Sequence, residues 1–358
     1  MSAKTKNISG LKVLLILLTA VPLCLATGCA KNIETEIPID NCIRITGMPG
    51  PEDFAYIASE NILVVSSDDR RNHEKDGKLF WIDLALPPEE QVGNPIDIEY
   101  PDSFKPHGVS YITTDTGGRL FVISHPNPAE GLHTVEVFDM TGSGNNREWK
   151  HVETLKSELY TSPNDLVALP DGTLFVSNDS GKGGNTIKKI KALFKIKNGD
   201  IIYYDGAEYI DFGNPESYGN GINYFKADGA EYLYRAALMD KSVKKYEIIR
   251  TEGKITGLKY LSKVDLGTMP DNLEIEPDGT IYAACHFNSF IFLKHAKDGA
   301  NISPTQILVV SPAGEVKEIY ANKGQEISAG SVGRVINGRL YIGQVFEGFL
   351  LSCPCCSE

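Results

Sequence analysis

Five pairs of neighbouring polar residues carry the side chains of this sequence that are best suited to chemistry. They are Glu52-Asp53, His107-Gly108, Asn164-Asp165, Asn220-Gly221 and Asp271-Asn272. Carboxylate and carboxamide oxygens are the ligands that Ca²⁺ prefers, and it takes six to eight of them in adaptable geometry. Zinc or copper would require more nitrogen or sulfur. If the pairs meet in space, they predict a site for a hard divalent cation beside a histidine.

The pairs lie on a sequence repeat, which indicates how they meet. A turn followed by an apolar strand recurs at Asn61 (ENILVVSS), Gly118 (GGRLFVISH), Gly172 (DGTLFVSND), Gly229 (DGAEYLYRAA), Gly279 (DGTIYAACH) and Gly338 (NGRLYIGQV). Repeats of about 50 to 60 residues built from β-hairpins are typical of propellers, with one blade per repeat. We therefore predict an all-β fold, a six-bladed β-propeller of four-stranded antiparallel blades over residues 42–353. The N- and C-terminal strands would close the ring together.

Equivalent positions of propeller blades face one another on the central axis, so the five pairs would surround it. One pair alone is better explained by local turn and cap hydrogen bonds. Five pairs on one repeat favour a shared site. Neighbours on a regular strand point to opposite faces, so both members of a pair reach the axis only if the strands begin irregularly.

Tight turns of Asp-Gly or Asn-Gly type join the first and second strand of each repeat. Reflecting the sequence about these turns predicts three opposed pairs: His107 with His125, Asn164 with Asp179, and Asp271 with His286. Directly opposed residues have Cβ atoms about 4.5–5.5 Å apart. The estimate therefore predicts two histidines side by side on an inner hairpin.

Composition narrows the function classes. The chain of 358 residues is 42% hydrophobic and has a formal net charge of −12 at pH 7. Nucleic-acid binding relies on clustered Lys and Arg, so the acidic balance argues against such a partner and suits a cation site. The sequence also lacks a P-loop, a dinucleotide-binding glycine motif, a His-Glu-x-x-His zinc motif and a Gly-x-Ser-x-Gly elbow.

The N-terminus predicts export. Lysines precede an apolar run, residues 13–26, which is short for a membrane span and has the layout of a secretory signal. The run ends in Leu-Ala-Thr-Gly-Cys, which resembles a bacterial lipobox with Cys29 as the lipidated residue. Cleavage after Ala30 and an uncleaved anchor are the alternatives. In each case residues 1–30 are a signal or anchor, residues 31–41 a linker, and membrane contact occurs only through this segment.

Export gives the cysteines a structural meaning, because disulfides persist in oxidising compartments. Cys42 opens the folded domain and Cys353 nearly closes it. The two ends of a ring-shaped fold meet in one blade, so a Cys42–Cys353 disulfide would lock the closure. Cys355 and Cys356, in the cysteine-rich tail of residues 354–358, compete for Cys42.

Eight short motifs follow the repeat in order. They are Pro51-Glu52-Asp53, Lys105-Pro106-His107-Gly108-Val109-Ser110, Ser124-His125-Pro126, Pro163-Asn164-Asp165, Asn220-Gly221-Ile222-Asn223, Pro270-Asp271-Asn272, Cys285-His286 and Gly343-Gln344-Val345-Phe346. Together they resemble the paraoxonases, a family of calcium-dependent lactonases and arylesterases. The resemblance runs from about Asn41 to Cys353. It implies a six-bladed propeller that holds two Ca²⁺ ions in its tunnel and acts on small lactone and ester substrates.

The resemblance also implies roles for individual residues. The catalytic calcium would be bound by Glu52, Asn164, Asn220, Asp271 and Asn272. The deeper, structural calcium would be bound by Asp53, Asp165 and the backbone carbonyl of Val109. The catalytic dyad would be His107 and His125.

In this mechanism, calcium polarises the substrate carbonyl and stabilises the oxyanion that forms on attack. His107, oriented by His125, takes a proton from the attacking water, and such help is worth about 10²–10⁴-fold. Without His125 and the family motif, His107 would be interpreted as an inner-strand histidine whose hydrogen bonds are satisfied locally. Glu52 or Asp271 is the alternative base, and His286 is expected to pack behind the calcium site.

Two other functions stay open at this stage. One is a sugar lactonase of the gluconolactonase or regucalcin type, which binds one metal with a smaller ligand set. The other is a non-catalytic propeller that binds a ligand or partner with a purely structural calcium, since fold does not imply function. The charged loop of residues 68–77 is expected to be exposed near the tunnel mouth and departs from the animal enzymes. The sequence defines neither the physiological substrate nor the oligomeric state.

Overall fold

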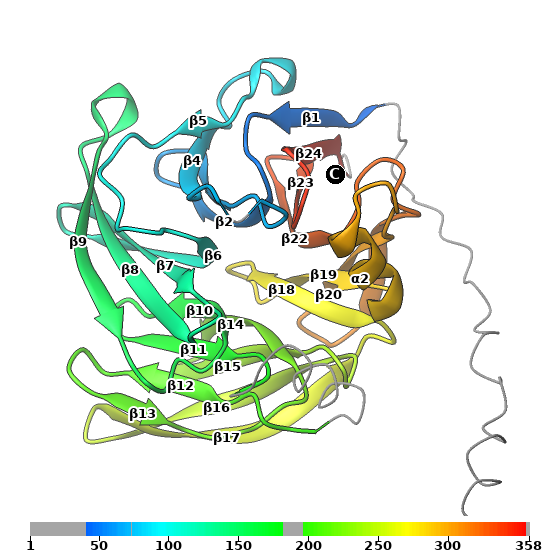
Figure 1. The fold of residues 1–358 in the computed structure, drawn as a ribbon. Helices are drawn as coiled ribbons and strands as arrows, with labels where there is room; N and C mark the ends of the chain where they lie inside the picture. Colours follow the sequence, from blue (N-terminus) through cyan, green and yellow to red (C-terminus); the bar gives the residue numbers. More distant parts are fainter. Residues whose placement is uncertain (1–40, 73, 182–195, 356–358) are drawn as a thin grey trace, which may run out of the picture. The chain divides into compact units, whose positions relative to one another are not determined.

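The computed structural model describes residues 41–72, 74–181 and 196–355. Within these ranges the strands form six four-stranded antiparallel sheets, which lie around a common axis (Figure 1). The predicted six-bladed β-propeller is therefore confirmed.

The blades are numbered here in chain order. Blade 1 consists of β2 (Pro51–Ile57), β3 (Ile62–Ser67), β4 (Lys78–Asp83) and β5 (Asn94–Pro95), and blade 2 of β6 (Pro106–Thr114), β7 (Gly117–Asn127), β8 (Leu132–Thr141) and β9 (Glu148–Lys156). Blade 3 consists of β10 (Pro163–Ala168), β11 (Leu174–Asn178), β12 (Ile201–Tyr204) and β13 (Tyr209–Asp211), and blade 4 of β14 (Gly219–Ala227), β15 (Ala230–Ala237), β16 (Ser242–Thr251) and β17 (Lys254–Asp265). Blade 5 consists of β18 (Met269–Ile275), β19 (Ile281–His286), β20 (Thr305–Val310) and β21 (Val316–Asn322), and blade 6 of β22 (Gly330–Ile336), β23 (Arg339–Gln344), β24 (Phe349–Pro354) and β1 (Ile43–Thr46). Helix α2 (Ser289–Lys297) separates β19 from β20, and short 3₁₀ turns lie at η2 (Pro88–Glu90) and η3 (Gly144–Asn146).

The repeated turns fold as their residues predict. Gly172 and Gly279 have φ angles of 83° and 90°, a left-handed conformation that glycine adopts without steric cost. Asn61 and Asn337 occupy the same region at the tips of other inner hairpins, which asparagine tolerates better than most residues. Each turn therefore folds a second strand back on the first strand of its blade, and in blades 1, 3 and 5 that first strand carries a polar pair near its start.

The ring closes through the two ends of the described chain. The N-terminal strand β1 pairs with β24 as the outermost strand of blade 6, and Cys42 forms a disulfide with Cys353. Both predictions are confirmed. A loop this long is expected to contribute about 2–5 kcal/mol to stability in the chain-entropy account. Cys285, in apolar strand β19, is a buried thiol whose pKa is raised by burial.

The three predicted opposed pairs are wrong in register. On the turn side each hairpin already pairs one residue away from the prediction, and a bulge at the start of each inner strand adds a second residue. Pro106 pairs with Ser124 and Val109 with Val122, so two residues of β6 oppose one of β7. In β18, two residues likewise oppose one residue of β19 between the pairs Pro270–Cys285 and Leu273–Ala283. Register breaks occur at the matching place in the other four inner strands of the described chain. Bulges re-aim side chains, so these strands begin irregularly, as a site on the axis requires.

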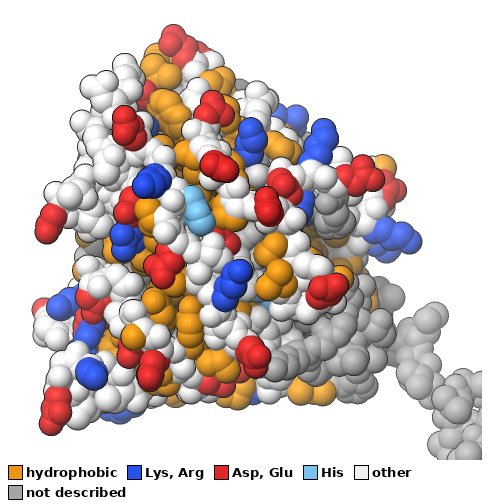
Figure 2. All heavy atoms as spheres, turned by 60° about the vertical axis from the view of Figure 1, so that its left-hand side comes forward, with side chains coloured by type: hydrophobic (Ala, Val, Ile, Leu, Met, Phe, Trp, Pro, Cys, Tyr) orange, Lys and Arg blue, Asp and Glu red, His pale blue; other side chains and the backbone are white. Residues whose placement is uncertain are grey.

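The hydrophobic core lies between neighbouring blades. One cluster joins Val64 of blade 1 to Leu120 and Phe138 of blade 2, and another joins Val135 of blade 2 to Leu174 of blade 3. This packing holds the inner strands at fixed distances from the axis. On the β8–β9 side, Figure 2 shows acidic, basic and hydrophobic side chains interspersed over the surface, without a basic stripe.

The predicted N-terminal segment is not part of this description. Cys29 and almost all of the linker 31–41 lie outside the described residues, as does Cys356. Within the described ranges, no helix is long and apolar enough to cross a membrane.

Candidate metal and active site

A chain of histidines starts at the mouth of the tunnel. Nε2 of His107 lies 3.2 Å from Oε1 of Glu52, and Nδ1 of His107 lies 2.7 Å from Nε2 of His125. Nδ1 of His125 in turn lies 2.8 Å from Nδ1 of His133. The predicted contact between His107 and His125 exists because the bulge turns His107 toward its neighbour. His133 was not predicted; a register estimate for the second hairpin, in which Ser124 pairs with Thr134, would have placed it near His125.

A second polar group lies on blades 4 and 5. Nε2 of His286 is 2.7 Å from Oδ2 of Asp271, and the Nδ2 amide of Asn220 donates to Oδ1 of Asp271. The ring of Phe292 on α2 packs 4.5 Å from the His286 ring. His286 therefore orients Asp271 from behind, and its other ring face is closed by the helix.

Buried oxygens without hydrogen-bond partners distinguish this end of the tunnel. Four of the five residues assigned by resemblance to the catalytic calcium have such an atom with respect to the described chain: Glu52 Oε2, Asn164 Oδ1, Asn220 Oδ1 and Asn272 Oδ1. Each unpaired buried polar atom costs about 1–3 kcal/mol, and such groups call for an explanation such as an ion. Hard oxygen donors on inner strands of four blades fit Ca²⁺.

The surroundings of Glu52 favour the charged form of its carboxylate. Burial alone would raise its pKa, but His107 and Arg70 outweigh burial and hold the pKa below its usual value. Oε1 faces His107, while Oε2 lies 3.7 Å from Nη2 of Arg70. Glu52 can therefore bind a cation through Oε2 while Oε1 contacts the histidine.

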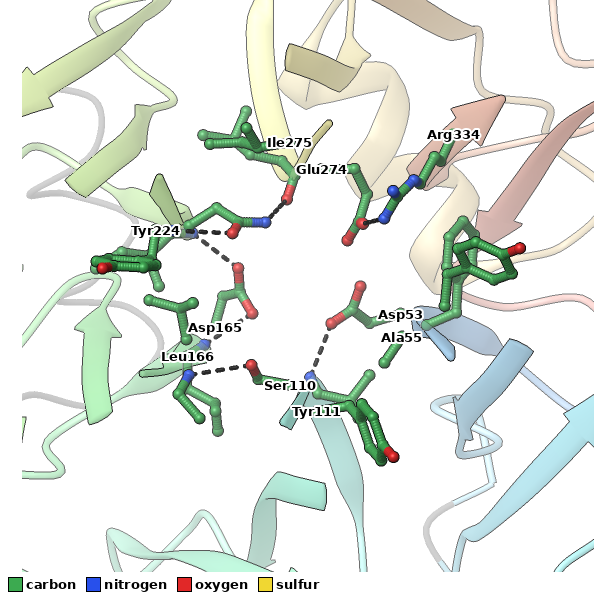
Figure 3. Close-up of a pocket in the computed structure, with 18 residues that line it drawn as sticks. Asp53, Ala55, Ser110, Tyr111, Asp165, Leu166, Tyr224, Glu274, Ile275 and Arg334 are labelled. Atoms are coloured by element: carbon green, nitrogen blue, oxygen red, sulfur yellow. Dashed lines mark hydrogen bonds and ion pairs between the residues drawn. The ribbon is translucent and has the colours of Figure 1, made fainter. Parts of the chain in front are cut away.

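The deeper carboxylates have a different environment. Oδ2 of Asp53 accepts a 2.8 Å hydrogen bond from the Val109 N–H. Asp165 accepts from the Leu166 N–H through Oδ1 at 2.7 Å and from the Ile222 N–H through Oδ2 at 2.8 Å. Burial, joined by the charge of Asp165, raises the pKa of Asp53, and burial raises that of Asp165. Both carboxylates line a cavity of about 200 Å³ on the axis (Figure 3).

The glycines of two polar pairs serve close packing rather than ligation. A Cβ on Gly108 would lie 2.7 Å from Oδ1 of Asp165, and one on Gly221 would lie 2.6 Å from the Asp271 carbonyl oxygen. Contacts below 3.0 Å are essentially never made by real Cβ atoms. Glycine at these positions lets adjacent inner strands approach closely enough to bring the carboxylates to the axis.

Two arginines of the β3–β4 loop also belong to the site. Arg70 donates to the Pro106 carbonyl oxygen at 3.1 Å, which ties Glu52 to the residue before His107. Arg71 and Arg70 are only half-exposed. The loop therefore contacts residues of the candidate site, but the predicted exposure is wrong for these arginines, because they pack onto groups from other blades.

Arg71 connects three loops beside the mouth. Its Nη2 donates to the His295 carbonyl oxygen at 2.7 Å, and its guanidinium lies 4.5 Å over the Phe346 ring. Nε2 of buried His295 lies 2.8 Å from Oε1 of Glu347. The loops of blades 1, 5 and 6 are therefore held together as one wall. Of these residues only Phe346 belongs to a motif that follows the repeat, so sequence periodicity did not single out Arg71, His295 or Glu347.

The fold and these residues define a β-propeller with an oxygen-rich axis and a histidine chain at one end. Residues 63–353 match the family model described as Arylesterase. The chain belongs to this family. It is 28% identical over 327 residues to serum paraoxonase/arylesterase 2 of Gallus gallus, covering 87% of this chain and 88% of the relative. It is 30% identical over 287 residues to the Homo sapiens protein of the same name, covering 76% of each.

Solved structures agree on the fold. A putative gluconolactonase superposes with a TM-score of 0.52 at 17% identity, covering 90% of this chain and 97% of that one. A calcium-binding protein, regucalcin, from Agrobacterium tumefaciens superposes with a TM-score of 0.51 at 14% identity, covering 88% and 95%. At these identities the similarity is one of fold alone.

Proposed function

We propose that this protein is a calcium-dependent hydrolase of lactones and aryl esters, with its active site at the tunnel mouth. The observation that carries the proposal is the set of buried, unpartnered oxygens beside the Glu52–His107 contact. Membership of the arylesterase family supports a hydrolase. The names of the relatives, serum paraoxonase/arylesterase and serum paraoxonase/lactonase, support esters and lactones as the substrate class.

The chain provides two sets of calcium ligands along the axis. The outer set is Glu52, Asn164, Asn220, Asp271 and Asn272, and the inner set is Asp53, Asp165 and the carbonyl of Val109. Oxygen ligands alone suit Ca²⁺ better than zinc or copper. Bound at the outer set, Ca²⁺ would polarise the substrate carbonyl and stabilise the developing oxyanion.

His107 acts as general base in this proposal. With Nδ1 donating to His125 Nε2, the Nε2 atom of His107 accepts a proton from the attacking water. The proton gained at Nε2 is then held against Oε1 of Glu52, 3.2 Å away. When the tetrahedral intermediate collapses and the ester C–O bond breaks, the leaving oxygen takes up this proton and His107 returns to its neutral form. His133 supports the tautomer through its 2.8 Å contact with His125. The half-buried wall around Arg71 limits the access of water to this side of the mouth.

We also propose that the domain acts outside the cytosol. The Cys42–Cys353 disulfide is expected in an oxidising compartment, and the names of the relatives describe serum proteins. Attachment through a lipid on Cys29 remains a prediction from the sequence.

The test is an assay of the purified protein on γ- and δ-lactones, gluconolactone and phenyl acetate. Activity is measured with calcium, after chelation with EGTA, and after calcium is returned. We expect hydrolysis of simple lactones and phenyl acetate that disappears on chelation and returns with calcium. A strong preference for gluconolactone would indicate the sugar lactonase instead. Absence of turnover from a folded, calcium-loaded protein would contradict the proposal and favour a binding propeller.

A further inference from the structure

A third row of residues lines the tunnel beyond the deep carboxylates. By the strand registers, the residues two positions after the Asp53 row are Ala55, Ser110, Val167, Asn223, Glu274 and Arg334. Two residues along a strand span about 6–7 Å and return to the same face. Only blades 5 and 6 contribute charged side chains to this row, and those two blades are neighbours.

Arg334 is held more firmly by a residue outside the cavity than by the one inside it. Glu276 accepts two hydrogen bonds from Arg334, from Nε at 3.0 Å and from Nη2 at 2.9 Å. Glu274 accepts one, from Nη1 to Oε2 at 3.0 Å. The bidentate contact to Glu276 is the stronger arrangement for a guanidinium and carboxylate. Glu276 therefore already provides a counter-charge for Arg334.

Glu274 faces the deep carboxylates. Glu274 and Arg334 line the same cavity as Asp53 and Asp165, and Figure 3 shows the carboxylates of Asp53, Asp165 and Glu274 pointing toward a common centre from three blades. The charge of Glu274 acts on both aspartates. With Glu276 balancing Arg334, the centre of the cavity keeps an excess of negative charge, which a divalent cation would neutralise.

We propose that Glu274 is a third carboxylate of the deep cation site, with Arg334 holding it in position across the boundary between blades 5 and 6. The proposal rests on the proposed calcium function and extends the deep ligand set of Asp53, Asp165 and the Val109 carbonyl. A ligand set with three carboxylates binds Ca²⁺ more tightly than one with two, because affinity in oxygen-ligand sites rises with ligand charge. The alternative is an ion pair that only clamps the two blades together.

Glu274→Gln and Glu276→Gln separate these two roles. Each substitution removes one negative charge beside Arg334 and keeps a hydrogen-bond acceptor, but only Glu274 lines the cavity. The calcium-loaded full-length proteins are mixed with a chromophoric chelator, and the release of Ca²⁺ is followed in time. We expect a slow phase from the deep site that is about ten-fold or more faster in Glu274→Gln and within about three-fold of the original rate in Glu276→Gln.

Equal acceleration in the two variants, or none in Glu274→Gln, would overturn the proposal and favour the clamp. A protein without a slow phase would overturn it as well. The melting temperature gives a second readout, because binding to the folded state stabilises it: the gain on adding calcium should shrink in Glu274→Gln and persist in Glu276→Gln. If Glu274→Gln does not fold, Glu274→Asp, which keeps the charge but withdraws it by one methylene, should show the same faster release.

The outcome is distinguishable from failure of the proposed function. If the protein binds calcium and hydrolyses lactones but Glu274→Gln releases calcium normally, only the third carboxylate is wrong. If the unmodified protein neither binds calcium nor hydrolyses these substrates, the function itself is wrong.

Discussion

Two adjacent layers of the tunnel hold similar polar residues whose oxygens differ in their hydrogen bonding. At the mouth, buried oxygens of Glu52, Asn164 and Asn220 lack hydrogen-bond partners within the described chain. In the layer below, Asp53 and Asp165 accept hydrogen bonds from backbone N–H groups of neighbouring blades. Backbone donors fix the deep carboxylates within the ring itself. In the proposed function, this difference suits the mouth to bind exchangeable ligands and the deep layer to hold the blades together.

The pKa shifts of the carboxylates also differ between the two layers. Against the effect of burial, His107 and Arg70 hold the pKa of Glu52 below its usual value. Burial and neighbouring carboxylates raise the pKa of Asp53. The Glu52 carboxylate is stabilised in its charged form, so it can bind a cation while it contacts His107. The deep carboxylates repel one another, so a bound cation would stabilise them most. The comparison predicts separate consequences for activity and stability when each end is altered.

The largest expected effect is on activity, from Glu52→Gln. This change removes the negative charge shared by the outer calcium and His107 while keeping the side-chain shape. We expect kcat/KM for a lactone to fall by at least about a thousand-fold, with little change in melting temperature. Glu247→Gln is the control, because Glu247 pairs with Lys259 in a solvent-exposed ion pair on blade 4. An active Glu52→Gln protein would remove the mouth from the mechanism.

His107→Gln tests the base. We expect kcat/KM to fall by about 10²–10⁴-fold, since glutamine cannot take up the proton at the position of Nε2. The matched control is His151→Gln, because His151 contacts Glu136 at 2.9 Å away from the axis and is half-exposed. If His107→Gln kept most of its lactonase activity, Glu52 or Asp271 would be the better candidate base.

Asp53→Asn should affect stability rather than chemistry. The asparagine oxygen can still accept from the Val109 N–H, but one charge of the deep site is lost. Losing an ion held at 100 to 1,000 times its Kd removes about 3–4 kcal/mol, or roughly 5–15 °C in melting temperature. Thermal unfolding with calcium and with EGTA measures this. A variant that melts like the original protein in calcium would contradict a structural role for the deep site.

The pH dependence of the calcium-free protein should reveal the deep aspartates. Their raised pKa values mean that the folded state holds protons that the unfolded state has lost, so their contribution to stability falls as pH rises through the raised pKa. Glu52 has the opposite sign, but its contribution is lost only on acidification below about pH 4. Between about pH 5 and pH 7 we therefore expect the melting temperature in EGTA to rise on acidification, and to rise less in Asp165→Asn. An equal response in the two proteins would contradict this assignment.

The features that could be predicted from the sequence are those that recur in the repeat or follow from closing a ring. The turn at Gly279 and the closure at Cys42 follow from local conformation and from the geometry of a ring. The predicted register was wrong for two reasons: each turn pairs its strands one residue away from the assumed mirror point, and a bulge adds another residue that no turn motif reveals. The contact between His107 and His125 exists nevertheless. His133 was missed because the register of the second hairpin of blade 2, β7 with β8, was not estimated. Arg70 and Arg71 were missed for a different reason: they contact groups from other blades, and such contacts depend on packing that periodicity does not encode.

The central claim is that the outer calcium serves catalysis and the deep calcium serves the fold. Stepwise removal of calcium tests it most directly, with bound Ca²⁺, lactone hydrolysis and circular dichroism followed in the same sample as chelator is added. We predict two bound ions per chain: activity disappears with the first to leave while the propeller stays folded, and the structure melts only with the second. Loss of activity and fold in a single step, or full activity after the first ion has gone, would contradict the account.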